Sequence, residues 1–226
     1  STRKESSAAS DVYKRQTFAI STLGGNLCRF AVGATPFLLA MLLQVGFGLS
    51  PFSAGLITFA SAAGALLMKF VATPIVRHFG FRRVLTVNAL LTGVFIMVCA
   101  TFTPATPVWL MIAILLVGGF FRSLQFTGVN TLTYADIPPA KMSRASSFAA
   151  MAQQLGISLG VGVAAVTLNV SMALRGAETL AVSDVVAGFI VIGLMCMAST
   201  FSFRRLEPQA GAHLNGAKPV SYTHLT

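Results

Sequence analysis

Three charged side chains lie inside long apolar runs of this 226-residue sequence: Arg29, Lys69 and Arg122. An ionisable group inside a run long enough to cross a membrane is a candidate functional residue. Lys69 lies about two helical turns from Arg77, so its long stem could carry the ammonium group to the membrane surface. For Arg29 and Arg122 two roles stay open: lining a hydrated cavity or holding a neighbouring helix.

Catalytic and metal-binding patterns are not found in these runs. The histidines lie outside them, at His78, His213 and His224, and the sequence contains neither HExxH nor GxSxG. We expect Asp136 and Asp184 near the ends of runs, so no carboxylate is expected at membrane depth. An enzyme would need a nucleophile with a base, or clustered metal ligands. We therefore predict no enzyme activity, no catalytic residue, no metal site and no cofactor.

Uncharged polar and aromatic residues complete the set that could contact a small molecule. Polar side chains within apolar runs often bond between helices or border a cavity. The predicted substrate-binding residues are Arg29, Phe37, Gln44, Arg122, Gln125 and Gln154. Simple packing remains the alternative for each of them, and it is the role that we predict for the cysteines, Cys28, Cys99 and Cys196.

The composition predicts an integral membrane protein. Apolar residues make up 55% of the chain, charged residues 10%, and the mean hydropathy is +0.78, whereas soluble domains carry roughly 25% charged residues. Crossing a membrane takes about 20 apolar residues in a helix. Six runs qualify, at about 23–44, 53–74, 84–102, 108–128, 145–170 and 183–203. The predicted fold is all-α, a polytopic bundle of six transmembrane helices.

The distribution of basic residues predicts how the bundle is oriented. The net charge is +10, but the basic residues are not interleaved with aromatic residues, which argues against a nucleic-acid partner. Alternate connections carry seven basic residues on one side and one on the other. The positive-inside rule places the loop RHFGFRR, residues 77–83, in the cytoplasm. We expect a multi-pass protein of the bacterial inner membrane, with lipid as a partner.

Small residues predict where helices approach one another. Gly156, Gly160 and Gly162 give the fifth run a face that would let a neighbouring backbone come close. Gly33 and Pro36 are expected to break or bend the first helix.

The two ends of the sequence differ in character from the six runs. We expect residues 1–16 and 219–226 to be non-native, linker-derived tails and residues 207–218 to be a cytoplasmic tail. The six-helix unit is then 17–206, and the natural protein is expected to be longer.

Three segments resemble the C-terminal half of a major facilitator superfamily carrier: RFAVGATPFLLAMLLQVGFG, PIVRHFGFRRVL, and the run from GGFFRSLQ to GISLGVGV. They are most similar to the fourteen-span drug:proton antiporters. The family's cytoplasmic loop motif, G-x-x-x-D-R-x-G-x-R-R, is matched at Gly80, Arg82 and Arg83. Thr73, Arg77 and His78 depart from it, so an ion-paired latch built on the motif's Asp is in doubt here.

The resemblance implies alternating-access efflux of drugs or other lipophilic compounds, coupled to protons, with this chain supplying one half of the carrier. The implied partners are the N-terminal half, a small-molecule substrate and protons. Two alternatives stay open: a carrier of the same fold for a sugar or organic acid, or a fragment that is inactive alone.

Overall fold

A computed structural model describes residues 24–134 and 142–206 of the chain, so the expected tails 1–16, 207–218 and 219–226 lie outside the described residues. The described residues form six helices, each long and apolar enough to cross a membrane. The first helix is Gly24–Gly46, and it is followed by α2 (Pro51–Phe79), α3 (Phe81–Val98), α4 (Val108–Tyr134), α5 (Met142–Leu174) and α6 (Val182–Arg204). The predicted all-α membrane bundle is confirmed.

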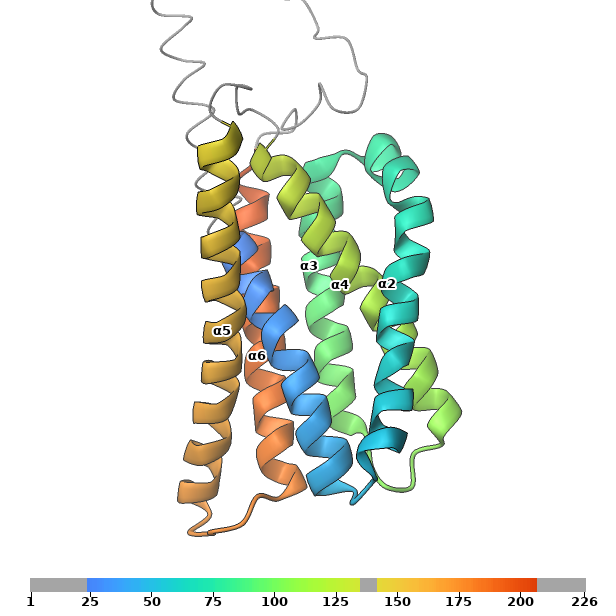
Figure 1. Ribbon diagram of the computed structural model, residues 1–226, viewed down its shortest axis with the longest axis vertical. Coiled ribbons are helices and arrows are strands. Elements are labelled where there is room, and N and C mark those ends of the chain that lie inside the picture. The colour runs from blue at the N-terminus through green and yellow to red at the C-terminus, as the bar shows by residue number, and fades with distance from the viewer. Residues whose placement is uncertain (1–23, 135–141, 207–226) are drawn as a thin grey trace, which may run out of the picture.

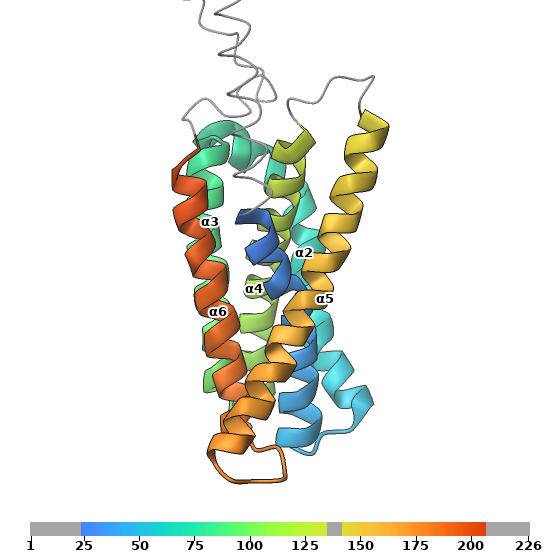
Figure 2. The same ribbon diagram turned by 90° about the vertical axis from the view of Figure 1, so that its left-hand side faces the viewer.

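The helices form a bundle in which they run alternately up and down (Figure 1 and Figure 2). Helix α2 packs on α4, α3 packs on both α4 and α6, and α5 packs on α6. The first helix contributes Ala31, Ala34 and Leu38 to the main hydrophobic core, with Phe189 of α6 beside them in the same cluster. Helices α2 and α5 lie at the two margins of the bundle in Figure 1, and both present large apolar side chains outward. Lipid is the solvent that such faces require.

The connection between α2 and α3 is much shorter than the predicted loop. Helix α2 continues past Pro74 to Phe79, and α3 begins at Phe81, so that Gly80 alone joins them. Gly80 has a φ of 76°, a left-handed conformation that favours glycine. The expectation of a loop over 77–83 was wrong because the polar residues there continue the two helices beyond their apolar parts.

The first helix packs closely on α5. A Cβ atom on Gly33 would lie 2.1 Å from the carbonyl oxygen of Ile157, and one on Gly160 would lie 2.2 Å from that of Phe30. Gly160 therefore has the packing role that its spacing predicted. Gly162 does not, because a Cβ there would meet nothing within 4 Å.

The helix Gly24–Gly46 runs without a break through Gly33 and Pro36. Its irregular part comes later, where Met41–Gly46 forms a π-helical turn, η1. The residues that predicted a break therefore lie one to two turns before the place where the helix changes its winding.

A buried carboxylate joins α5 to α6 at the end of the bundle away from Gly80. Asp184, in the first turn of α6, accepts hydrogen bonds from Ser171 Oγ at 2.6 Å, Arg175 Nε at 2.9 Å and the Ala181 amide at 2.9 Å. The hydrogen bond to Asp184 raises the pKa of Arg175. Asp184 is fully buried. The sequence placed this residue near the end of a span but did not indicate its burial or its partners.

Candidate functional site

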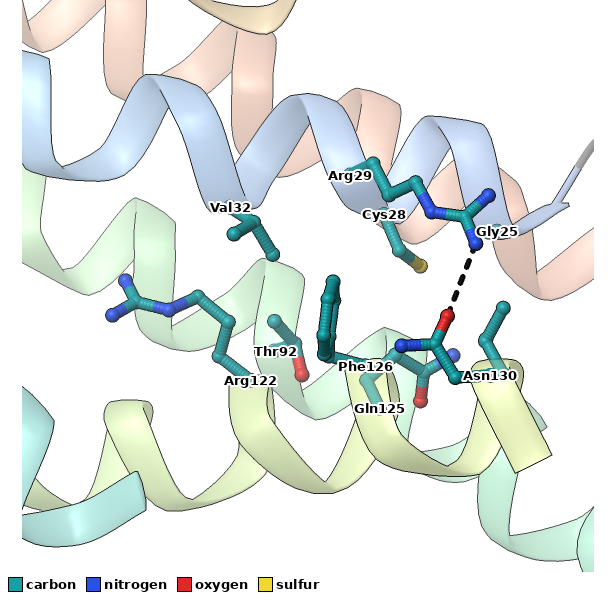
Figure 3. A pocket seen from close by; sticks show the side chains of 10 residues that line it. Gly25, Cys28, Arg29, Val32, Thr92, Arg122, Gln125, Phe126 and Asn130 are labelled. Atoms are coloured by element: carbon teal, nitrogen blue, oxygen red, sulfur yellow. Dashed lines mark hydrogen bonds between the residues drawn. The ribbon is translucent and has the colours of Figure 1, made fainter. Parts of the chain in front are cut away.

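A small cavity lies between the first helix and α4, and Figure 3 shows the side chains around it. Its volume is about 10 Å³, which is room for roughly one water molecule. The residues that line it come mainly from these two helices: Gly25, Cys28, Arg29, Val32, Thr92, Arg122, Gln125, Phe126, Val129 and Asn130. Three of the predicted site residues therefore meet at one place.

Arg29 is held at one end of this cavity by two amide side chains. Its Nη1 donates to Asn26 Oδ1 at 3.1 Å, one helical turn away, and its Nη2 donates to Asn130 Oδ1 of α4, also at 3.1 Å (Figure 3). Only 3% of the Arg29 surface is exposed. Gly156 of α5 leaves room beside the Arg29 side chain, since a Cβ there would lie 3.1 Å from Arg29 Cβ. The guanidinium thus ties the first helix to α4.

Arg122 lies at the other end, with Val32 and Phe126 between the two guanidinium groups in Figure 3. It is half-buried, and its Nη2 donates to Ser61 Oγ of α2 at 2.6 Å. It also borders a second cavity of about 20 Å³, where Ser61, Thr35 and Thr92 are the polar neighbours. Arg122 therefore stands between two small polar cavities while it holds α4 to α2.

Gln125 belongs to a buried network that reaches α3. Asn88 Nδ2 donates to Gln125 Oε1 at 2.9 Å and to the carbonyl oxygen of Phe121 at 2.8 Å. On the first helix, the thiol of Cys28 lies 3.1 Å from Ser199 Oγ of α6. Buried polar groups in lipid need partners of this kind, and these contacts fix the rotation of four helices around the cavity.

The sequence did not indicate Asn88 and Ser61 as partners of the predicted residues, Thr92 as a lining residue, or the pairing of Asn130 with Arg29. A polar amide in the middle of the third apolar run was the available signal for Asn88. Nothing in the spacing of these residues showed which helix each would face.

The structure does not bring the other three predicted residues to this cavity. Phe37 packs half-buried against the hydrophobic core. Gln44 lies in the π-helical turn η1, about 22 Å along the helix from Arg29 at 1.5 Å per residue. Gln154 is exposed on α5. Contact of these residues with a substrate stays a prediction.

The residues that match the loop motif lie together where α2 meets α3. Gly80 makes the turn, Arg82 Nη2 donates to the carbonyl oxygen of Arg204 at 3.0 Å, and the Arg83 guanidinium lies 5.9 Å from the ring centre of Phe79. Arg82 therefore connects the start of α3 to the end of α6. The described residues show no carboxylate partner for these arginines, and the ion-paired form of the latch stays unsupported here.

The interior of the described bundle suits the binding of a charge or a water molecule better than the binding of a drug-sized compound. Ligand pockets for such compounds measure roughly 300–1,000 Å³, against about 10 and 20 Å³ for the two cavities between the helices. The Arg122 guanidinium donates to a neutral hydroxyl, that of Ser61, so its positive charge stays available to an anion.

Comparison with known proteins gives a family match over most of the chain. Residues 21–223 match the family model described as Major Facilitator Superfamily. The chain is 35% identical over 159 residues to a protein of Pectobacterium atrosepticum provisionally named multidrug resistance protein MdtD, an alignment that covers 70% of this chain and 34% of that protein. Proteins of the same name from Pectobacterium carotovorum and Cronobacter sakazakii are 35% and 32% identical over 158 residues, again 70% of this chain and 34% of each.

The chain spans about a third of the length of the curated relatives that it matches. No solved structure matches it significantly.

Proposed function

The chain belongs to the major facilitator superfamily, and from this premise we propose that it supplies one half of a carrier that exports lipophilic compounds. The observation that carries the proposal is the similarity to proteins named for multidrug resistance, in a chain whose described residues form six membrane-length helices. We assign the chain to the C-terminal half of a fourteen-span carrier in the bacterial inner membrane. Transport would proceed by alternating access, in which two bundles rock around a shared site.

The small interior cavities support a site shared with the rest of the carrier. A drug-sized compound does not fit between the described helices, so its binding surface must include a second bundle. Arg122 and its neighbours would border that site through Phe126, which lines the same cavity. An apolar surface with few hydrogen-bonding groups suits varied lipophilic substrates.

Proton coupling requires a group that takes up and releases protons within the membrane. The described residues contain two carboxylates, Glu178 and Asp184, and both lie at the end of the bundle away from Gly80. Asp184 is already bound to Arg175 and Ser171. We therefore assign proton exchange to a carboxylate outside the described residues, close enough for its charge to act on Arg122.

One observation favours a second function, transport of an anionic solute such as an organic acid. The Arg122 guanidinium lies at membrane depth and donates to a neutral hydroxyl, that of Ser61. A central arginine costs at least about 2.5–3.5 kcal/mol on insertion scales, and a bound carboxylate would offset part of that cost.

The test uses the complete carrier that contains this chain, expressed in a bacterium that lacks its main efflux systems. We expect energy-dependent extrusion of a fluorescent lipophilic cation, and we expect Arg122→Leu to abolish most of it while the protein still reaches the membrane. Uptake of a radiolabelled organic acid, without extrusion of the cation, would instead favour the anionic solute.

Arg144→Leu is the matched control, because Arg144 is exposed in the first turn of α5 and lines neither cavity. Normal extrusion by Arg122→Leu would reject a transport role for Arg122. Loss of folded protein in that variant, but not in Arg144→Leu, would assign Arg122 to packing. The chain expressed alone should insert but extrude nothing, since it provides one wall of the site.

A further inference from the structure

A groove of about 390 Å³ opens at the end of the bundle where α2 meets α3 and α6 ends. It is far larger than the two cavities between the helices. Arginine and apolar residues share its lining: Phe79, Gly80, Arg82, Arg83, Thr86, Val87 and Arg204. It is distinct from the site proposed for transport and shares no residue with the cavity between the first helix and α4.

Two of its three arginines are held in place by the fold. Arg82 is half-buried and donates to the last carbonyl of α6, that of Arg204. Arg83 is exposed and lies over the ring of Phe79. A guanidinium carries five N–H donors in a planar fork, so each side chain retains donors for a further acceptor. The groove is therefore a partly preorganised cluster of hydrogen-bond donors.

Positive charge dominates this end of the described bundle. Asp184 and Arg204 lie at opposite ends of α6, twenty residues apart, which is about 30 Å along the helix. Glu178 lies in the connection between α5 and α6, at the same end of the bundle as Asp184. Three arginines thus meet in one groove, while the described carboxylates lie at the far end of the bundle.

The groove also has an apolar side, which distinguishes it from a site for a free anion. Phe79 is 51% exposed and Val87 is 50% exposed, and both belong to helices that span the membrane. A ligand that places a phosphate against arginine and hydrocarbon against Phe79 and Val87 matches both sides. Basic pockets between transmembrane helices bind acidic headgroups in this way.

We propose that this groove binds an anionic membrane phospholipid, with its phosphate held by Arg83 and Arg204 and an acyl chain along Phe79 and Val87. Arg82 positions the groove by tying α3 to α6. The bound lipid would connect the ends of α2, α3 and α6, where Gly80 joins α2 to α3 and the Arg82 hydrogen bond joins α3 to α6.

The experiment measures lipid binding to the purified chain in neutral detergent by native mass spectrometry. The probe is phosphatidylglycerol, compared with phosphatidylcholine of the same acyl chains and with inorganic phosphate. Each arginine near an acidic headgroup contributes enough for about a fivefold change in affinity. We expect preferential binding of phosphatidylglycerol, about fivefold weaker in Arg83→Gln or Arg204→Gln and weaker again in the double variant.

Arg144→Gln is the control, since it removes the same charge from an exposed position outside the groove. Its affinity should be unchanged. Equal affinity for the two lipids, equal weakening by Arg144→Gln, or displacement of the lipid by millimolar inorganic phosphate would each overturn the proposal.

Glu207 follows α6 in the sequence and lies outside the described residues, so Glu207→Gln is tested as well. Binding of phosphatidylglycerol by Glu207→Gln but not by the unaltered chain would also overturn the proposal. Unfolding temperatures of all variants, measured without added lipid, separate a lost site from a lost fold.

Discussion

Adding one methyl group to Gly160 should separate the first helix from α5. The new Cβ would lie 2.2 Å from the carbonyl oxygen of Phe30, about 1.2 Å short of the 3.4 Å at which ordinary contact begins. Because the nearest atoms belong to the backbone, no side-chain rotation can relieve the clash. The two helices must move apart at Phe30, which directly follows Arg29 in the first helix.

The expected loss in the free energy of unfolding follows from the surroundings of the two glycines on α5. Overpacking of a close contact costs about 1–3 kcal/mol, so Gly160→Ala should lower the free energy of unfolding by that amount. Gly162→Ala meets nothing within 4 Å and should be neutral or gain up to about 1 kcal/mol from helix propensity. Gly33→Ala, 2.1 Å from the Ile157 oxygen, should resemble Gly160→Ala.

The assay is reversible unfolding of the purified chain in mixed micelles, with helix content as the readout. The double variant Gly33→Ala/Gly160→Ala should cost less than the sum of the two single variants, because one separation of the helices relieves both contacts. Gly160→Ala as stable as Gly162→Ala would refute the packing of the first helix on α5.

Three further predictions concern other parts of the bundle. Asn88→Leu removes two hydrogen bonds to α4 and should lower unfolding free energy by about 1–3 kcal/mol, whereas Asn169→Leu, whose amide bonds only within α5, should change it little; equal losses would contradict the network. Asp184→Asn should lower the unfolding temperature more than Glu178→Gln, an exposed carboxylate, because Asp184 is buried with four donors. In a background without native cysteines, a cysteine at position 105 should react with an impermeant maleimide on whole cells and one at position 78 should not; the reverse pattern would invert the orientation.

The sequence predicted the fold class and all six helices because membrane insertion depends on local properties. A run of about 20 apolar residues must form a helix in hydrocarbon, since no water is present to satisfy its backbone. The ends of the helices were predicted less well. Polar residues such as Arg77 and His78 predicted a loop, yet in the structure they continue α2 as far as Gly80.

The candidate site could be predicted only in its residue types. Arg29, Arg122 and Gln125 were identified because polar groups are costly in lipid, and the structure places all three around one cavity. Gln44 and Gln154 met the same criterion and lie elsewhere. The free-energy cost of placing a polar side chain in lipid indicates that it needs a partner, but it does not indicate where that partner lies.

The composition and spacing of this chain therefore determine what each segment becomes, whereas the tertiary structure decides which segments meet. Arg29 and its partner Asn130 are 101 residues apart. Gly160 and Gly162 are identical in type and two positions apart, yet one touches a backbone and the other faces open space. Two positions turn about 200° around a helix, and only the packed bundle determines which side of that helix faces a neighbour.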